Sequence, residues 1–196
     1  EEAGYACYWQ GAQGGVARAS GRCWQDAFEF RRWSNLVCTH RAPLIEAMRY
    51  AAIGGGKRLR PLLLASVAEM YGVQRNAAIR AGVAIEAIHV YSLIHDDLPC
   101  MDDDAMRHGK PTLHLAYDEA TAVLAGDSLH AFAFEVLADP ATSADPFTRI
   151  ELVQTLGHAS GAQGMAGGQM MDLVAENSDF DLQTVTRLQQ LKTGAL

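Results

Sequence analysis

Apolar residues recur every three or four positions from Pro43 to the end of the chain, and runs of β-branched residues are rare. This spacing puts apolar side chains on one face of a helix, whereas a half-buried strand would alternate them. The pattern predicts helices over residues 43–53, 60–71, 75–98, 118–138, 147–175 and 179–196. Asp118, and either Ser178 or Asp179, are expected to cap two of them. The sequence therefore predicts an all-α fold.

Two of the predicted helices have unusual compositions. The segment from Ala120 to Leu137 is apolar almost all round, which is typical of a helix buried on most sides. A central helix of this kind indicates a large bundle rather than a four-helix one. The segment 147–175 contains five interior glycines, each costing about 1 kcal/mol relative to alanine. They indicate close helix–helix approach or a bend, and a local break is the simpler alternative.

Residues 1–40 differ in character from the rest of the chain. They contain all three tryptophans and three of the four cysteines, without a clean helical period. We therefore expect an atypical N-terminal segment over 1–40 and a helical domain over 41–196. The chain begins at Glu1 rather than at a methionine and ends at Leu196 within a predicted helix. We expect it to be a C-terminally truncated piece of a longer protein.

Composition argues against several functional classes. Hydrophobic residues make up 49% of the 196, which is ordinary for a globular domain. The net charge of −7 argues against nucleic-acid binding. Because no uninterrupted apolar run reaches the ~18 residues of a membrane span, we expect no transmembrane segment. The cysteines lack the CxxC spacing typical of zinc ligands, and reduced cysteines fit a cytoplasmic protein.

Five aspartates occupy nine positions directly after an apolar helical stretch. Carboxylates this close repel each other unless a cation neutralises them. Mg²⁺ commonly takes one or two carboxylates, and phosphate oxygens and water complete its coordination shell. The cluster therefore predicts a magnesium site with a phosphorylated ligand, and a solvated acidic loop is the simpler alternative. The five residues are Asp96, Asp97, Asp102, Asp103 and Asp104.

Helical phase leaves open which later aspartate joins Asp96. On a straight helix Asp103 would align with it, but Pro99 removes a backbone hydrogen bond and kinks the chain. After the kink, Asp102 can come round instead. His89 lies seven residues before Asp96 and points the same way, about 10 Å along the helix at ~1.5 Å per residue. A histidine satisfied within the core is the alternative for His89.

Basic residues flank the acidic cluster on both sides. Upstream, the glycines of Gly54-Gly-Gly-Lys-Arg-Leu-Arg-Pro61 open into Lys57, Arg58 and Arg60. Glycines let the backbone approach an anion, and guanidinium groups bind phosphate in a fork. Downstream is Arg107-His-Gly-Lys-Pro-Thr112. A nucleotide P-loop and a Ser-His-Asp triad are not indicated. An acidic metal site between two cationic segments indicates a diphosphate ligand.

Six ordered motifs carry a family resemblance. They are Gly55-Gly-Lys-Arg-Leu-Arg-Pro61, His95-Asp-Asp-Leu-Pro-Cys-Met-Asp-Asp-Asp104, Gly109-Lys-Pro-Thr-Leu-His114, Leu124-Ala-Gly-Asp127, Gly168-Gln-Met-Met-Asp-Leu173 and Lys192-Thr-Gly-Ala-Leu196. Over residues 41–196 the chain resembles the trans-isoprenyl diphosphate synthases, most closely those of the bacterial farnesyl type. The resemblance implies a helical bundle of the isoprenoid synthase kind, Mg²⁺ as cofactor, and isopentenyl and allylic diphosphates as substrates. It also implies a homodimer.

The resemblance implies roles for the residues at matching positions. Mg²⁺ would be bound by Asp96 and Asp102. The catalytic group would comprise Asp96, Asp97, Asp102, Arg107 and Lys192. Mg²⁺ and the cationic side chains would stabilise the departing diphosphate, which is electrostatic stabilisation of a developing charge. The allylic cation left behind would then be attacked by the isopentenyl double bond.

Substrate contacts and product length are also implied. Substrate binding is implied for Lys57, Arg60, His89, Arg107, His108, Gln169, Lys192 and Thr193. Tyr91, five residues before the first aspartate, occupies the family's chain-length position, and an aromatic there resembles farnesyl-type enzymes. Because its neighbour Ser92 is small, a geranylgeranyl product is an alternative.

The chain departs from the family pattern at two functional positions. The family usually has two arginines where this chain has Arg107-His108, and a histidine is only partly charged near neutrality. The family's second aspartate-rich motif would lie beyond Lys192, outside this sequence. A non-catalytic partner subunit of a prenyl synthase is therefore a further alternative. An HD-type phosphohydrolase and a terpene cyclase fit the motifs less well.

Overall fold

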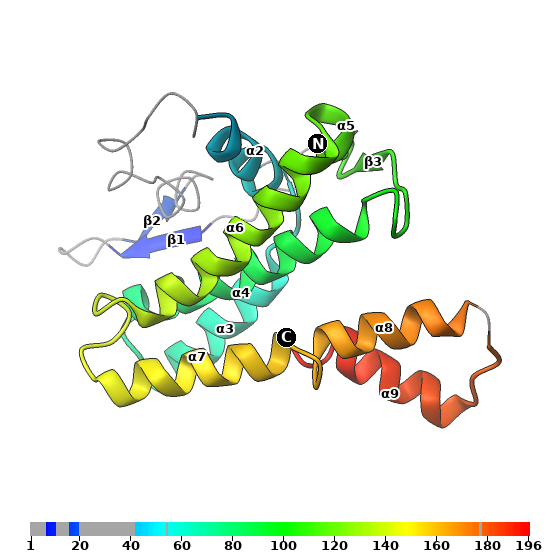
Figure 1. Cartoon of the computed structure of the whole chain (residues 1–196). Coiled ribbons are helices and arrows are strands. Elements are labelled where there is room, and N and C mark those ends of the chain that lie inside the picture. Colours follow the sequence, from blue (N-terminus) through cyan, green and yellow to red (C-terminus); the bar gives the residue numbers. More distant parts are fainter. Residues whose placement is uncertain (1–6, 11–15, 20–41, 54, 177) are drawn as a thin grey trace. The chain divides into compact units, whose positions relative to one another are not determined.

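The computed structural model describes residues 7–10, 16–19, 42–53, 55–176 and 178–196. Within these ranges the regular secondary structure is helical apart from two short antiparallel strand pairs (Figure 1), which confirms the predicted all-α class. The helices are α2 (Ala42–Ile53), α3 (Leu59–Met70), α4 (Arg75–Asp96), α5 (Leu113–Ala116), α6 (Glu119–Ala138), α7 (Pro146–Ser160), α8 (Met165–Ala175) and α9 (Leu182–Lys192). The paired strands are β1 (Cys7–Gln10) with β2 (Val16–Ala19), and β3 (Met106–Arg107) with β4 (Lys110–Pro111).

The predicted helix bounds hold within two residues for α2, α3, α4 and α6. The predicted helix over 147–175 is wrong as a single element, because the backbone breaks between Gly161 and Gly164 into α7 and α8. Gly161 ends α7 by donating its N–H to the Gly157 carbonyl oxygen. The simpler alternative for this glycine-rich segment, a local break, is therefore what the structure contains. Residues 1–40 outside β1 and β2 lie outside the described part of the chain.

Aspartate caps begin three of the helices. The Asp118 carboxylate accepts hydrogen bonds from the Thr121 amide, at 2.8 Å, and hydroxyl, and these bonds hold the pKa of Asp118 below its usual range. Its predicted capping role at α6 is thus confirmed. At α9 the cap is Asp181, which accepts from the Thr184 amide at 2.8 Å. The predictions of Ser178 or Asp179 there are wrong, since the helix begins three residues later. Asp145 caps α7.

The chain forms two compact units. One contains the described residues up to Leu59 together with His89–Ala131, and the other contains Arg60–Ile88 and Phe132–Leu196. The core is rich in small side chains, and Ala84, Ala87, Ala122 and Ala125 are fully buried. Because alanine adds little bulk, the helices that carry these residues can approach their neighbours closely.

The helix α6 is buried on one side and exposed on the other. The helix α6 is buried along a single stripe that includes Leu129 and Ala133, whereas Val123 and Leu124 are exposed. The prediction that this helix is buried on most sides is therefore wrong for the described chain.

Both α4 and α6 are long and apolar enough to cross a membrane by length and composition alone, although each is partly buried within the structure. Partly buried core helices of soluble proteins pass the same test.

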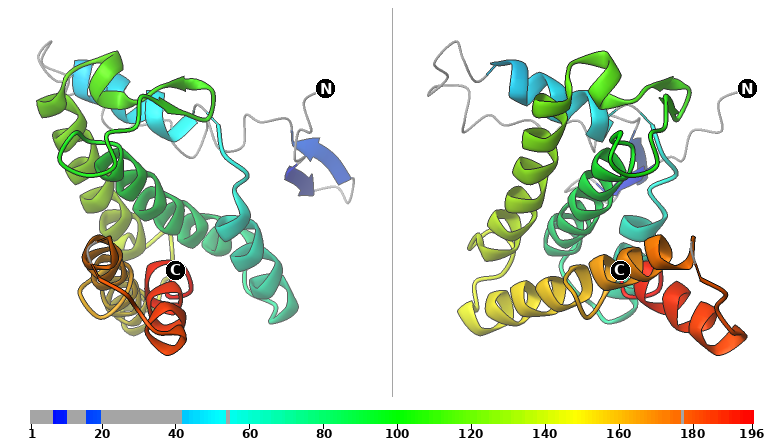
Figure 2. Two further views of the ribbon diagram at one scale, coloured as in Figure 1. Left: turned by 90° about the vertical axis from the view of Figure 1, so that its right-hand side faces the viewer. Right: turned by 45° about the vertical axis from the view of Figure 1, so that its right-hand side comes forward.

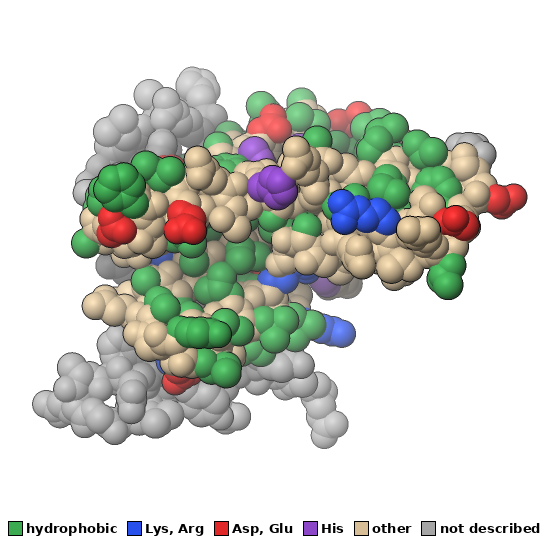
Figure 3. Space-filling model, turned by 90° about the horizontal axis from the view of Figure 1, so that it is seen from below, with side chains coloured by type: hydrophobic (Ala, Val, Ile, Leu, Met, Phe, Trp, Pro, Cys, Tyr) green, Lys and Arg blue, Asp and Glu red, His purple; other side chains and the backbone are tan. Residues whose placement is uncertain are grey.

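Large hydrophobic side chains are exposed at several places on the described surface (Figure 3). On α3 they form a stripe at helical spacing, with Leu63 at 64% and Met70 at 81% exposure. Leu62 and Val67 belong to the same stripe.

The helices α8 and α9 form a tight hairpin within the second unit (Figures 1 and 2). A Cβ placed on Gly168 would lie 2.2 Å from the Lys192 backbone nitrogen and 2.6 Å from its Cα. Such separations are too short for non-bonded atoms, and the obstacle is backbone rather than a flexible side chain. Gly168 is therefore the position at which the close helix approach predicted from the glycine content occurs.

We expect Gly168→Ala to lower the free energy of unfolding by about 1–3 kcal/mol, because the added methyl group must push α9 away from α8. Urea unfolding followed by circular dichroism measures the change. Gly157→Ala in α7 is the matched control. The nearest atom to a Cβ at Gly157 is in the Phe134 ring at 3.8 Å, so alanine fits and adds helix propensity of up to about 1 kcal/mol. Equal stability of the two variants would contradict the assigned close contact.

Candidate functional site

The acidic cluster forms a tight turn at the C-terminal end of α4. The Leu98 N–H bonds to the His95 carbonyl oxygen at 3.2 Å, and Pro99 then stops the helix. The chain turns back so that the Asp102 N–H donates to the Asp96 carbonyl oxygen at 2.9 Å. Of the two alternatives left open by helical phase, Asp102 is therefore the one whose backbone bonds to Asp96. Asp96 is half-buried and Asp102 is exposed.

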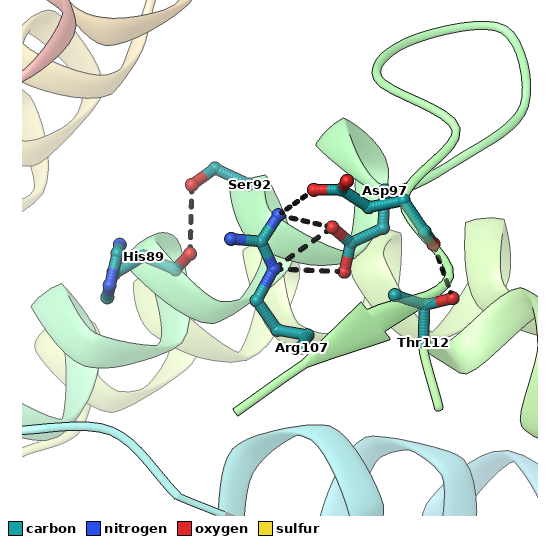
Figure 4. Close-up of polar contacts among 6 residues, drawn as sticks. His89, Ser92, Asp97, Arg107 and Thr112 are labelled. Atoms are coloured by element: carbon teal, nitrogen blue, oxygen red, sulfur yellow. Dashed lines mark hydrogen bonds and ion pairs between the residues drawn. The ribbon is translucent and has the colours of Figure 1, made fainter. Parts of the chain in front are cut away.

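Asp97 lies in a different environment from its neighbours. Its side chain is only 4% exposed, and its carboxylate accepts from Arg107 through Nε, at 3.0 Å to Oδ1 and 3.3 Å to Oδ2, and through a terminal guanidinium nitrogen (Figure 4). The side-chain hydrogen bond to Asp97 is the main reason that the pKa of Arg107 is raised. Asp97 therefore faces Arg107, and this pairing compensates the cost of burying its charge.

The Arg107 side chain is anchored on a short hairpin formed by β3 and β4. Besides Asp97, its guanidinium binds the Asp104 carboxylate at 3.0 Å. The hydroxyl of Thr112, which is 1% exposed, donates to the Asp104 carbonyl oxygen at 2.7 Å (Figure 4). Sequence reasoning missed Asp104 and Thr112 as supports of Arg107. Their signal was weak, since the three later aspartates look equivalent in the sequence.

The glycines of the upstream cationic segment meet the downstream segment within the first unit. Gly55 and Gly56 adopt φ values of +154° and +94°, and a Cβ on Gly55 would lie 3.0 Å from the His108 Cβ. The glycines thus admit His108 against the backbone of the upstream segment. Arg58 donates to the Ala52 carbonyl oxygen at 2.6 Å, at the end of α2, and Lys57 is exposed. The contact brings His108 and the segment containing Lys57 into one region, as a shared anion site requires.

His89, Tyr91 and Ser92 follow one another along α4 in the same unit. The Ser92 hydroxyl donates to the His89 carbonyl oxygen at 2.8 Å (Figure 4). All three side chains are half-buried. Tyr91 contacts two imidazole rings and has a raised pKa, caused first by burial and then by the charge of Asp96. Tyr91 lies five residues before Asp96 on the same helix.

The remaining predicted site residues belong to the second unit. Arg60 lies in the first turn of α3, Gln169 on α8, and Lys192 at the end of α9 with Thr193 directly after it. The Lys192 ammonium group is paired with Asp172, a residue that the sequence reading did not assign. The joining of these residues with Asp96 and Asp102 into one site is still a prediction from the sequence.

The acidic turn fits a magnesium ion by the chemistry of its donors. In the described ranges, no three histidine, cysteine, aspartate or glutamate side chains converge as a ready-made metal site. Mg²⁺ does not need such a cage, because it is usually held by one or two carboxylates with phosphate oxygens and water. The carboxylates of Asp96 and Asp102 are hard oxygen donors, and a backbone hydrogen bond joins the two residues. Asp97 is engaged with Arg107 instead.

Comparison with known proteins places these features in context. The profile of the family described as "Polyprenyl synthetase" matches residues 41–196. Farnesyl diphosphate synthase of Haemophilus influenzae is 49% identical over 159 residues, which are 81% of this chain and 53% of the relative. The chloroplastic geranylgeranyl pyrophosphate synthase of Capsicum annuum is 45% identical over 152 residues, or 77% of this chain and 41% of the relative. The chain spans about half the length of the curated relatives it matches.

A solved structure supports the same relationship. The crystal structure of a farnesyl/geranylfarnesyl diphosphate synthase from Zymomonas mobilis, determined without ligand, shares 54% identity with this chain. It superimposes with a TM-score of 0.79 over 89% of this chain and 67% of that one. The helical arrangement therefore has a counterpart determined by experiment.

Proposed function

Because the chain belongs to the polyprenyl synthetase family, we propose that the protein condenses an allylic diphosphate with isopentenyl diphosphate to give a short-chain prenyl diphosphate, chiefly farnesyl diphosphate. The observation that carries the proposal is the acidic turn, in which Asp102 bonds to Asp96 beside the buried Asp97–Arg107 pair. The relatives named farnesyl diphosphate synthase support the product.

The residues of this chain would act mainly by binding and charge stabilisation. Mg²⁺, held by Asp96 and Asp102, would neutralise negative charge on the diphosphate leaving group. Arg107 would hold the allylic diphosphate, and the family resemblance implies the same ligand for Lys192 and Thr193. Such preorganised charges need little reorganisation as the carbon–oxygen bond breaks.

The second diphosphate would lie at the glycine-rich segment. Lys57, Arg60 and His89 would hold isopentenyl diphosphate, and His108 would contribute from its place against Gly55. The apolar parts of α4 and α6 would exclude water, which would otherwise capture the allylic cation. Gln169 would line the pocket, and the departing diphosphate would accept the proton released after coupling.

Turnover by the full-length protein tests the proposal. Incubation with Mg²⁺, dimethylallyl diphosphate and labelled isopentenyl diphosphate is expected to yield mainly farnesyl diphosphate, resolved by chromatography. Chelation of Mg²⁺ should abolish product formation, and an excess of Mg²⁺ should restore it. A folded protein that forms no prenyl diphosphate of any length would refute the proposed function.

A geranylgeranyl diphosphate synthase is the second candidate. Ser92 is a small residue next to the chain-length position, and the Capsicum annuum relative is named for that activity. The same assay separates the candidates, since a product dominated by geranylgeranyl diphosphate would favour the second.

We further propose a cytoplasmic homodimer whose helical domain begins near residue 41, with residues 1–40 as a separate segment. Analytical ultracentrifugation tests the dimer.

A further inference from the structure

Tyr91 is held between two imidazole rings within the first unit. Its ring centroid lies 5.6 Å from that of His95 and 4.9 Å from that of His130, with interplanar angles of 80° in both pairs. Edge-to-face contacts at these separations are attractive for aromatic rings. His95 lies one turn further along α4, and His130 lies on α6. The orientation of the phenol ring is therefore determined from two different helices.

The ring of His95 occupies the space left by the missing side chain of Gly126 on α6. A Cβ on Gly126 would lie 2.2 Å from its Nε2, so the imidazole occupies the space that a side chain at 126 would fill. The same Nε2 lies 3.2 Å from the Val123 carbonyl oxygen and 4.0 Å from the Asp127 carboxylate. One neighbour of Tyr91 is thus held by backbone geometry. The other neighbour, His130, supports the ring by its side chain.

The pKa shifts favour the neutral forms of two of the rings. Burial raises the pKa of Tyr91, and the charge of Asp96 acts in the same direction. Burial lowers the pKa of His130, His95 acts in the same direction, and Asp127 opposes them. Neutral aromatic side chains are suited to contact a hydrocarbon chain rather than a charged group. Tyr91 and His130 therefore form a pair of packed rings five residues before Asp96 on α4.

We propose that His130 is a specificity-determining residue, which fixes the ring of Tyr91 and thereby limits the length of the prenyl chain accepted. The inference rests on the proposed function and extends it to a residue on a second helix. Tyr91 lies five residues before Asp96, about 7.5 Å along the helix at ~1.5 Å per residue. A chain whose diphosphate is held at Asp96 and whose tail extends back along α4 meets this ring. Loss of His130 removes the 4.9 Å contact and lets the ring turn aside.

Binding of substrate analogues tests this proposal without requiring turnover. The full-length protein, in the presence of Mg²⁺, is titrated by calorimetry with farnesyl and geranylgeranyl thiolodiphosphates. His130→Ala is expected to improve geranylgeranyl binding relative to farnesyl binding by roughly three- to tenfold, the factor associated with one aromatic contact. His130→Phe keeps a ring in place and should retain the wild-type preference. His158→Ala, which removes an exposed histidine on α7, is the control.

Each outcome decides the proposal. A preference in His130→Ala that equals that of His158→Ala overturns it, while wild-type binding of farnesyl thiolodiphosphate still supports the proposed function. If the folded wild-type protein binds neither analogue, the proposed function fails together with this inference. If His130→Ala does not fold by circular dichroism, His130→Leu fills the same region without an aromatic ring. That variant is expected to show the same shift, and its absence refutes the role of His130.

Discussion

Asp96→Asn is expected to lower the turnover number for prenyl coupling by about a thousandfold, which corresponds to several kcal/mol of lost charge stabilisation. The substitution keeps the size of the side chain and the backbone bond from Asp102, and it removes one of two carboxylates proposed to hold Mg²⁺. Steady-state kinetics at saturating concentrations of both substrates measures the effect. Raising the Mg²⁺ concentration is expected to restore only part of the activity.

Asp103→Asn is the matched control for this result. Asp103 is exposed and has a φ of +50°, a conformation that asparagine also tolerates, so the variant changes charge without straining the turn. Its turnover number is expected to stay within about threefold of wild type, as for a peripheral charge change. If both variants lose activity equally, the net charge of the cluster matters and the assignment of Asp96 as a metal ligand fails.

Arg107→Ala is expected to lower the free energy of unfolding by about 3 kcal/mol, because it leaves the buried Asp97 carboxylate without its cation. This value is at the lower end of the usual range for a broken buried pair, since the Arg107 side chain is 32% exposed. Activity should also fall, because the same guanidinium is proposed to hold the allylic diphosphate. Urea unfolding and steady-state kinetics measure the two effects separately.

Two further variants separate the structural role of Arg107 from its proposed role in binding. Asp104→Ala removes the more exposed partner and should cost less than about 1 kcal/mol, as exposed ion pairs do. The double variant Asp97→Leu with Arg107→Met replaces the pair by apolar side chains, which commonly restores stability. Activity should not recover in it. A fully active double variant would rule out Arg107 as a substrate ligand.

Helix positions were predictable because apolar spacing determines them locally, and α2, α3, α4 and α6 lie within two residues of the predicted bounds. The division of 147–175 was not predictable from spacing, since interior glycines indicate close approach or a bend and also allow a local break. The structure contains both a break, at Gly161–Gly164, and a close contact, at Gly168.

The acidic cluster illustrates why side-chain partners are harder to predict than motifs. The sequence identified the five aspartates and the flanking cations, but their spacing did not distinguish exposed carboxylates from the buried one. Asp97 directly follows Asp96 in the sequence, yet its carboxylate is buried against Arg107 whereas Asp96 is half-buried. The cluster of Tyr91 with His130 depends on the approach of α6, which no local pattern in the sequence encodes.

The contact between Gly168 and the Lys192 backbone determines how precisely the α8–α9 hairpin positions Gln169 and Lys192 relative to each other. Gln169 immediately follows Gly168 on α8, and the backbone of Lys192 on α9 lies directly against Gly168. The distance between the Cα atoms of Gln169 and Lys192 is therefore set by contact between the two main chains. Main chain in contact compresses little, whereas a pair of long side chains can adjust by changing rotamers. The hairpin therefore holds Gln169 and Lys192 at a separation set by the backbone, which is possible because Gly168 has no side chain.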